Sequence, residues 1–227
     1  MIGGHDFPAR FWDRSNAGCQ LATRLAGHGR SPQSIVLALP RGGVPVAYEV
    51  ATFLGLPLDV FLVRRLGLPG RSELAIGAIS SGGVRVLNKA LIRRLHVADH
   101  LVERVTAEQR LVLCRREASY RNGRPACTVT GRSVILVDDG LATGATMGAA
   151  IAALRRRSPA SVVVATPIAP PSVCAQLETQ VDEVVCAHTP EEFGTLGRWY
   201  QDFSPTTDDQ VREILARSPN DGPTEAW

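Results

Sequence analysis

Long hydrophobic runs are missing from this sequence. The longest, such as residues 133–137 and 162–165, fall far short of the roughly 20 apolar residues that a membrane-spanning helix needs. The first residues interleave His5, Asp6 and Arg10 with apolar side chains, so no secretory signal is recognisable there. We therefore expect a cytoplasmic protein that has no membrane partner.

Cysteine is scarce and follows no ligand pattern. The five cysteines are widely spaced, their number is odd, and no Cys-x-x-Cys or Cys/His ligand spacing occurs. These features exclude a disulfide-rich scaffold and a zinc finger. We expect reduced thiols, and we expect no metal site made by the protein alone.

Net charge is also small. The chain has 25 basic and 22 acidic residues, a formal charge of +3, which is too little to indicate nucleic-acid binding. Lys89 is the only lysine, so arginine supplies nearly all of the positive charge. A coding sequence rich in guanine and cytosine would produce that bias by itself. Arginine also suits phosphate and pyrophosphate groups, and composition leaves both explanations open.

The chain is long enough for one domain with an elaboration. It has 227 residues, of which 44% are hydrophobic, as in ordinary globular proteins. Short apolar runs alternate with amphipathic segments, which predicts an α/β fold: a Rossmann-like parallel sheet of about five strands flanked by helices. Predicted strands cover 34–39, 58–63, 133–137, 162–166 and 181–186, and predicted helices cover 11–25, 44–54, 97–120, 143–154, 171–177 and 208–216.

Two segments do not follow this alternation. Residues 67–83 are rich in glycine and predict a flexible hairpin loop that turns at 81–83 and returns through 84–87. The tail after residue 189 is rich in aromatic side chains. We predict a single domain over 1–217 with its core at about 34–190. The N-terminal helix and the tail would form a small hood, and residues 218–227 a disordered tail.

The most informative segment runs from Val134 to Thr146. A buried strand ends in two adjacent carboxylates, Asp138 and Asp139, and a loop with glycine and threonine then opens a helix. In an open α/β sheet ligands bind at this edge, and a helix N-terminus attracts a phosphate. Two acids beside a phosphate fit a ligand that also presents hydroxyl groups or a bound divalent cation. The segment therefore predicts a sugar-phosphate site.

This segment resembles the 5-phosphoribosyl-1-pyrophosphate (PRPP) signature of type I phosphoribosyltransferases: an apolar strand, two acids, a short spacer and Thr-Gly-x-Thr. The resemblance implies that Asp138 and Asp139 bind the ribose 2- and 3-hydroxyls. Alanine at 142 makes the loop similar to the adenine type, and the nearest relatives by this resemblance are uncharacterised bacterial proteins with a phosphoribosyltransferase domain. The residues implied to wrap the 5-phosphate are Ala142, Thr143, Gly144, Ala145 and Thr146.

Two further elements agree with this resemblance. Residues 39–43 resemble the family's short pyrophosphate loop, which implies that Arg41, Gly42 and Gly43 bind pyrophosphate. Arg64 and Arg65 occupy the place where adenine- and orotate-type members carry an Arg-Lys pair beside a flexible catalytic loop. Arginine in place of that lysine keeps the charge but changes how the side chain contacts a leaving pyrophosphate.

The resemblance implies an enzyme that transfers 5-phosphoribose from PRPP to a nitrogenous acceptor, a nucleobase, and releases pyrophosphate. Magnesium would be the cofactor, held by PRPP near the two acids and not by the protein alone. Positive charge that develops on the ribose would lie beside the acids, and negative charge on the leaving group beside arginines. The catalytic residues would be Asp138, Asp139, Arg64 and Arg65.

The sequence leaves the acceptor open. No base-recognition stretch of the adenine type is recognisable. Residues 167–171 and the aromatic side chains of Phe193, Trp199 and Tyr200 are candidates for an acceptor pocket. The same aromatic side chains can equally form a hydrophobic latch over the sheet edge.

Two other hypotheses compete with the enzyme. One is a regulatory protein of the same fold that binds PRPP and has little or no transferase activity, since some family members regulate transcription or bind RNA. The other is a different nucleotide binder, such as a PRPP-synthetase-like subunit, which a single PRPP loop in a chain of this length disfavours. Relatives are often dimers, so the resemblance also implies a homodimer as one outcome.

Overall fold

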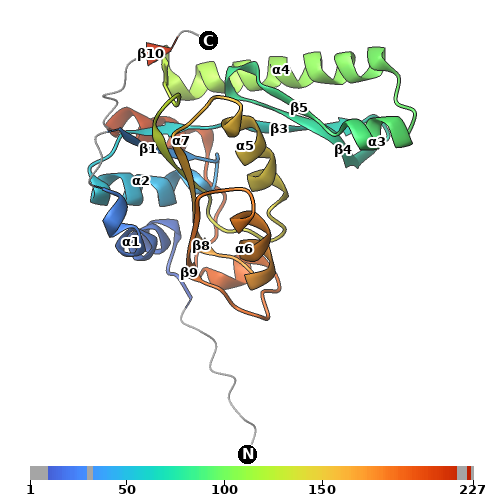
Figure 1. Ribbon diagram of the computed structural model, residues 1–227. Coiled ribbons are helices and arrows are strands. Elements are labelled where there is room, and N and C mark those ends of the chain that lie inside the picture. Colours follow the sequence, from blue (N-terminus) through green and yellow to red (C-terminus); the bar gives the residue numbers. More distant parts are fainter. Residues whose placement is uncertain (1–9, 30–32, 219–223, 226–227) are drawn as a thin grey trace, which may run out of the picture.

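Five strands form one parallel sheet at the centre of the protein (Figure 1). The computed structural model describes residues 10–29, 33–218 and 224–225. The strand order is β2-β1-β7-β8-β9, and every neighbouring pair is parallel, which confirms the predicted fold class. The strands are β1 (Ser34–Ala38), β2 (Leu58–Val60), β7 (Ser133–Val137), β8 (Ser161–Ile168) and β9 (Glu183–His188).

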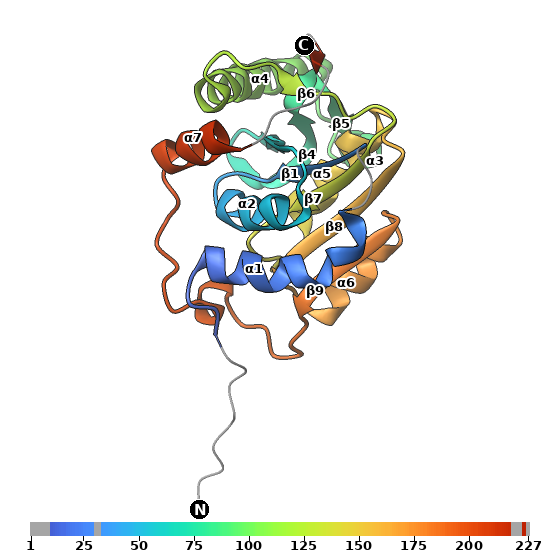
Figure 2. The same ribbon diagram turned by 90° about the vertical axis from the view of Figure 1, so that its left-hand side faces the viewer.

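Helices cover both faces of this sheet, which explains why its central strands are almost continuously apolar (Figure 2). Alternate residues of β1 enter separate cores: Val36 packs with one set of helices and Ile35 with the other. The first set is α1 (Arg14–Arg24) and α2 (Gly43–Leu54), and the second is α5 (Ala145–Arg155) and α6 (Pro171–Glu178).

A second sheet corrects the prediction for residues 58–83. It is antiparallel and consists of β3 (Val63–Leu68), β4 (Arg71–Ser80) and β5 (Arg85–Leu87). The predicted strand 58–63 is wrong in extent, because the chain leaves the parallel sheet after Val60 and begins β3 at Val63. The hairpin turns at residues 69–70, and residues 81–83 form a 3₁₀ turn, η2 (Ser81–Gly83), between β4 and β5.

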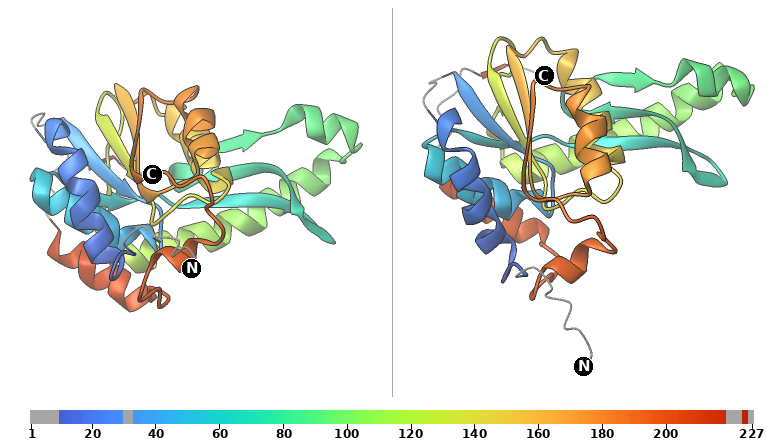
Figure 3. Two further views of the ribbon diagram at one scale, coloured as in Figure 1. Left: turned by 90° about the horizontal axis from the view of Figure 1, so that it is seen from below. Right: turned by 60° about the horizontal axis from the view of Figure 1, so that its bottom comes forward.

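This antiparallel sheet and two helices form an arm that projects from the parallel sheet (Figure 3). The helices are α3 (Lys89–Arg94) and α4 (Asp99–Arg121), and α4 corresponds to the predicted helix over 97–120. Leu66, Ile76 and Ile79 are fully buried in the same core as the apolar face of α4. The glycines of this segment concealed the strand pattern, because glycine is typical of loops.

The N-terminal segment and the C-terminal tail lie side by side. Phe11 and Tyr200 form an isolated parallel bridge. The tail contains η3 (Leu196–Trp199) and then α7 (Asp208–Arg217), which packs against α2 and α4 (Figure 2). A short 3₁₀ turn, η1 (Ala26–His28), follows α1. Within the described residues, no helix has the length and apolar character needed to cross a membrane.

The end of the chain partly contradicts the prediction of a disordered tail over 218–227. Strand β10 (Thr224–Glu225) pairs with β6 (Ala126–Cys127) in antiparallel fashion. The remainder of that prediction, at 219–223 and 226–227, lies outside the described residues. The apolar character of the segment is low, so its pairing with β6 depends on backbone hydrogen bonds that a sequence pattern does not reveal.

Candidate functional site

Two adjacent strands bring the main predicted loops together. β1 and β7 pair in register, with Ala38 opposite Val137, and both end at the same edge of the sheet. The N–H of Leu39 continues the pairing by donating to the carbonyl of Val137 at 2.8 Å. The loop that holds Arg41 therefore lies beside the loop that begins with the two acids, as the sequence predicts for a site at the carboxyl end of the strands.

Glycines 42 and 43 allow this close approach. A Cβ on Gly42 would overlap the carboxylate of Asp139, and a Cβ on Gly43 would lie 2.8 Å from the carbonyl oxygen of Val137. No other residue fits these two positions without moving the acids. The peptide bond between Pro40 and Arg41 is cis. The loop after β1 thus forms one wall of the acid pair.

Asp138 is the partly buried member of the acid pair. Its Oδ1 accepts a hydrogen bond from the backbone N–H of Asp139 at 2.9 Å. Burial raises the pKa of the Asp138 carboxyl well above its ordinary value, and the neighbouring charge of Asp139 raises it further. Asp138 therefore holds a proton over a wider pH range than an ordinary aspartate.

Asp139 is buried and paired with a residue that the sequence did not indicate. Its side chain forms an ion pair with Arg14, whose Nε lies 2.7 Å from Asp139 Oδ2. The Tyr200 hydroxyl donates to the Asp139 backbone carbonyl at 2.5 Å. Burial and the charge of Asp139 raise the pKa of Tyr200, so the phenol keeps the proton that it donates. Arg14 stands 125 positions before Asp139, and no spacing pattern connects them.

The predicted phosphate loop is exposed at the start of α5. Gly144 has a φ of +67°, and its carbonyl accepts the N–H of Gly148 at 2.8 Å, which begins the helical hydrogen bonding. Amides in the first turn of a helix have no partner within the helix and attract anions. A Cβ on Gly144 would lie 3.0 Å from Val173 of α6. The exposed residues of the loop are Ala142, Thr143, Ala145 and Thr146.

Arg64 and Arg65 lie in β3 and not at the end of a strand of the parallel sheet, which corrects their predicted position. Successive strand residues point to opposite faces. Arg64 Nε donates to Gln109 Oε1 on α4 at 2.9 Å, and its burial, with nearby Arg116, lowers its pKa. A pocket of about 370 Å³ brings the arginines to the phosphate loop; Val63, Arg64, Arg65, Gly67, Gln109 and Thr146 line it.

Arg41 lies in contact with α7 instead of that pocket. Its guanidinium forms an ion pair with Asp208, with Nη1 and Oδ1 3.7 Å apart, and both side chains are about half exposed. The hydroxyl of Tyr120 also donates to Asp208, at 2.6 Å. Burial and Asp208 raise the pKa of Tyr120 to about 12. The structure therefore groups the arginine pair of β3 with the phosphate loop and groups Arg41 with the acid pair.

The aromatic residues of the tail form a latch. Phe193, Trp199 and Tyr200 are buried in a cluster with Phe11 and Ile168. Trp199 Nε1 donates to the carbonyl of Phe193 at 2.8 Å, so the polar atom of the indole is used within the cluster. Because the rings are covered by one another, they offer no open face for an acceptor. This arrangement favours the latch among the two predicted alternatives.

Known proteins resemble this chain over most of its length. The family model described as the phosphoribosyl transferase domain matches residues 19–194. Two candidate phosphoribosyl transferases of Mycobacterium tuberculosis, from strains CDC 1551 and H37Rv, are each 46% identical over 212 residues, which cover 93% of this chain and 47% of the relative. The chain thus spans about half the length of these relatives. The structure of TT1426 from Thermus thermophilus is 45% identical with a TM-score of 0.82, covering 93% of this chain and 100% of that one.

Proposed function

Because this chain belongs to the phosphoribosyl transferase domain family, we propose that it transfers the 5-phosphoribosyl group of PRPP to a nitrogen atom of an acceptor, a nucleobase, and releases pyrophosphate. One observation carries the proposal. The ends of β1 and β7 bring a basic glycine loop, two adjacent acids and an exposed helix N-terminus to one edge of the sheet. A ligand with a pyrophosphate, a diol and a phosphate presents complementary groups in the same order.

Each part of PRPP has a partner in this proposal. The amides and hydroxyls of residues 142–146 bind the 5-phosphate, and Asp138 and Asp139 bind the ribose hydroxyls. Gly42 and Gly43 let the loop after β1 approach the ribose, and Arg41 exchanges its half-exposed contact with Asp208 for the pyrophosphate. Arg65, on the exposed face of β3, supports the phosphate loop from the side of the pocket.

The charges of these groups suit the transfer step. As the bond from ribose C1 to the pyrophosphate oxygen breaks, its electron pair leaves with pyrophosphate and positive charge develops on the ring. The acid pair lies beside the ring and stabilises that charge, and Arg41 stabilises the leaving group. The acceptor nitrogen then forms the new bond to C1. The phosphate loop holds the 5-phosphate throughout, so the ring stays aligned with the leaving group.

Magnesium is the cofactor that we propose, bound to the pyrophosphate oxygens of PRPP. Mg²⁺ commonly takes one or two carboxylates together with substrate phosphates, and the two adjacent aspartates fit that donor set. Across residues 10–29, 33–218 and 224–225, no group of three or more His, Cys, Asp or Glu side chains is placed to hold a metal ion. This supports an ion that arrives with the substrate, where its charge stabilises pyrophosphate.

Titration calorimetry tests the proposed site. We expect wild-type protein to bind PRPP with Mg²⁺ in the micromolar range, and we expect the variant Asp138→Asn/Asp139→Asn to lose that binding. The matched control is Glu191→Gln/Glu192→Gln, which removes two adjacent acids that are exposed elsewhere. Equal binding by the wild type and the Asp138/Asp139 variant contradicts the assignment of the acids to the ribose.

A pyrophosphate-release assay then tests the transfer. We expect release to require PRPP, Mg²⁺ and one acceptor from a panel of nucleobases and amines. Binding of PRPP without release for any acceptor overturns the enzyme and favours the PRPP-binding regulatory protein. Absence of PRPP binding by the wild type overturns both.

A further inference from the structure

Arg14 reaches the acid pair from the start of the described chain. It is the first residue of α1, which Asp13 caps by accepting the N–H of Asn16. The Arg14 and Asp139 side chains are only 11% and 12% exposed, so their ion pair lies in a poorly solvated place. Breaking such a pair by removing one partner leaves an uncompensated buried charge, which is costly. The contact is therefore a strong restraint on the position of the Asp139 carboxylate.

The guanidinium of Arg14 is itself held from two other directions. Its Nη1 donates to the carbonyl of Ser204 at 2.7 Å, and its Cζ lies 4.1 Å from the centre of the Phe203 ring. Stacking on an aromatic ring together with two directed hydrogen bonds uses the planar fork that only arginine provides. Lysine would keep the charge but not this geometry.

The segments that carry these groups are joined by their backbones. The N–H of Gln201 donates to the carbonyl of Phe11, and the N–H of Asp202 donates to the carbonyl of Trp12, both at 2.8 Å. The N-terminal segment and the tail therefore hold the guanidinium as one unit. Neither segment carries a residue of the predicted PRPP motifs.

Arg14 decides which oxygens of the acid pair are left for a ligand. It occupies Oδ2 of Asp139, and the Asp139 N–H occupies Oδ1 of Asp138. On the opposite side, Gly42 leaves room for the Asp139 carboxylate but for no additional atom. One oxygen of each carboxylate is thus fixed by the protein, and the other two are presented as a pair. Two adjacent acceptors match the two hydroxyls of a vicinal diol.

We infer that Arg14 is a positioning residue for ribose recognition, which fixes Asp139 so that the acid pair accepts both hydroxyls of a vicinal diol. This inference rests on the proposed function, because the diol is that of PRPP. A purely structural ion pair would lower stability and would weaken all ligands of the site alike. A positioning residue changes the preference between a ligand that has both hydroxyls and one that lacks the 2-hydroxyl.

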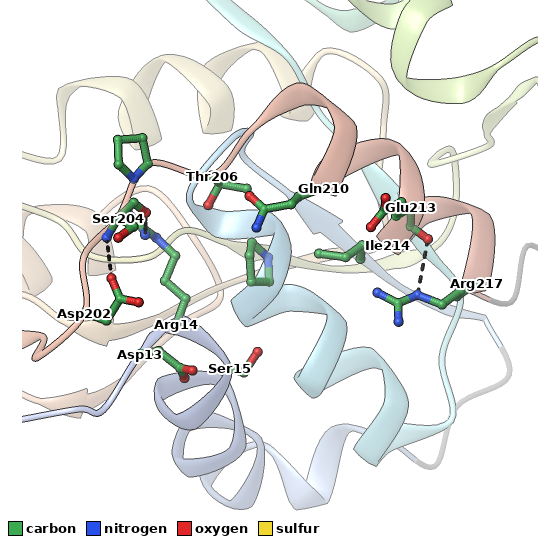
Figure 4. Close-up of a pocket in the computed structure, with 12 residues that line it drawn as sticks. Asp13, Arg14, Ser15, Asp202, Ser204, Thr206, Gln210, Glu213, Ile214 and Arg217 are labelled. Carbon is green, nitrogen blue, oxygen red and sulfur yellow. Dashed lines mark hydrogen bonds between the residues drawn. The ribbon is translucent and has the colours of Figure 1, made fainter.

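A second arginine near Arg14 provides a matched control. A crevice of about 320 Å³ between α1 and α7 has Arg14 on one wall and Arg217 on the other (Figure 4). Arg217 Nε donates to the carbonyl of Glu213 at 3.4 Å. Its guanidinium also lies 5.6 Å from the Tyr48 ring centre, away from Asp139. Arg217→Gln therefore removes the same kind of side chain from the same crevice without touching the acid pair.

The test compares ribose 5-phosphate with 2-deoxyribose 5-phosphate by titration calorimetry. We expect wild-type protein to prefer the ribose compound about tenfold or more, since the deoxy compound leaves an acid oxygen without its donor. In Arg14→Gln we expect that ratio to fall toward one, with an intermediate ratio in Arg14→Lys and the wild-type ratio in Arg217→Gln. Thermal unfolding of each variant confirms that it is folded.

An unchanged ratio in folded Arg14→Gln overturns the inference. If Arg14→Gln does not fold, Arg14→Lys and Phe203→Leu decide instead, since both loosen the guanidinium and keep its partner; an unchanged ratio in both overturns it too. A wild type that binds both sugar phosphates equally refutes diol recognition by the acids and the role of Arg14 with it. A wild type that binds neither refutes the proposed function itself, so the two failures are distinct.

Discussion

The acid pair and the phosphate loop are separated by only Gly140 and Leu141, yet they are supported in opposite ways. Asp139 is 8% exposed and is held by a side chain from α1 and by the tail. A Cβ on Gly140 would overlap the side chain of Leu196, so the tail presses on this half of the segment directly. Residues 142–146 are largely exposed and depend on the turn at Gly144 and the start of α5.

This difference indicates how the site divides its work. A phosphate is recognised by amides that the local backbone presents, so the loop needs few partners from elsewhere. A diol must be met by oxygens in a defined orientation, and carboxylates rotate unless other groups hold them. The acids therefore depend on distant segments. Changes in the hood should affect recognition of the sugar and spare recognition of the phosphate.

The largest effects are expected from one methyl group added on each side. In Gly42→Ala the new Cβ overlaps the Asp139 carboxylate, and overpacking of this kind costs about 1–3 kcal/mol. We expect PRPP binding to weaken about tenfold and inorganic phosphate binding to stay unchanged. In Gly144→Ala the positive φ costs about 1–2 kcal/mol and Val173 is crowded, so both ligands should bind more weakly.

Calorimetric titration with PRPP and with inorganic phosphate measures both effects. Gly148→Ala is the control, because its surroundings are open, with the nearest atom 4.0 Å from the added Cβ. Loss of phosphate binding in Gly42→Ala would show that the two halves of the segment are not independent.

A smaller effect is expected from Tyr200→Phe. The variant removes the donor to the carbonyl of Asp139 at a buried position, which should lower the free energy of unfolding by about 1–3 kcal/mol. PRPP affinity should fall more than phosphate affinity, since the acids move and the loop does not. Urea denaturation and calorimetry measure these quantities, with Tyr48→Phe, a partly buried tyrosine outside the site, as control. Equal losses for both ligands would contradict the comparison.

The acid pair should also give stability a pH dependence that the phosphate loop lacks. Burial and the neighbouring Asp139 raise the pKa of Asp138 above 3.8 in the folded protein, so the folded state binds its proton more tightly than the unfolded state. The free energy of unfolding should therefore fall as the pH rises from about 3.8 toward the raised pKa. Asp138→Asn should remove this fall. Denaturant unfolding at several pH values tests it, and parallel pH curves for the two proteins would refute it.

The smallest effect is expected at Asp208. Its ion pair with Arg41 is long and half exposed, and such pairs contribute about 0–1 kcal/mol. Asp208→Asn should leave stability nearly unchanged and should alter PRPP affinity by no more than about threefold, as Arg41 becomes free for pyrophosphate. Asp209→Asn, at the next position of α7, is the control. A loss of tenfold or more would show that Asp208 holds Arg41 in its binding position.

Predictability followed the same division. The apolar runs of β1 and β7 and the glycine turn at Gly144 were predicted, because each depends on a few neighbouring residues. The hairpin of β3 and β4 was not, because glycines 67 and 77 resemble loop residues until the arm packs on α4. The placement of Arg64 and Arg65 failed with it, since they followed a strand that ends earlier than predicted.

The sequence by itself determined the family, the parallel sheet and the phosphate loop, because strand patterning and positive-φ glycine act over short stretches of chain. Only the tertiary structure decided how the second acid is held. Arg14, Gly42 and Tyr200 contact the same aspartate from three distant parts of the chain. Their meeting depends on how the hood folds over the sheet edge, and no local pattern of residues encodes that contact.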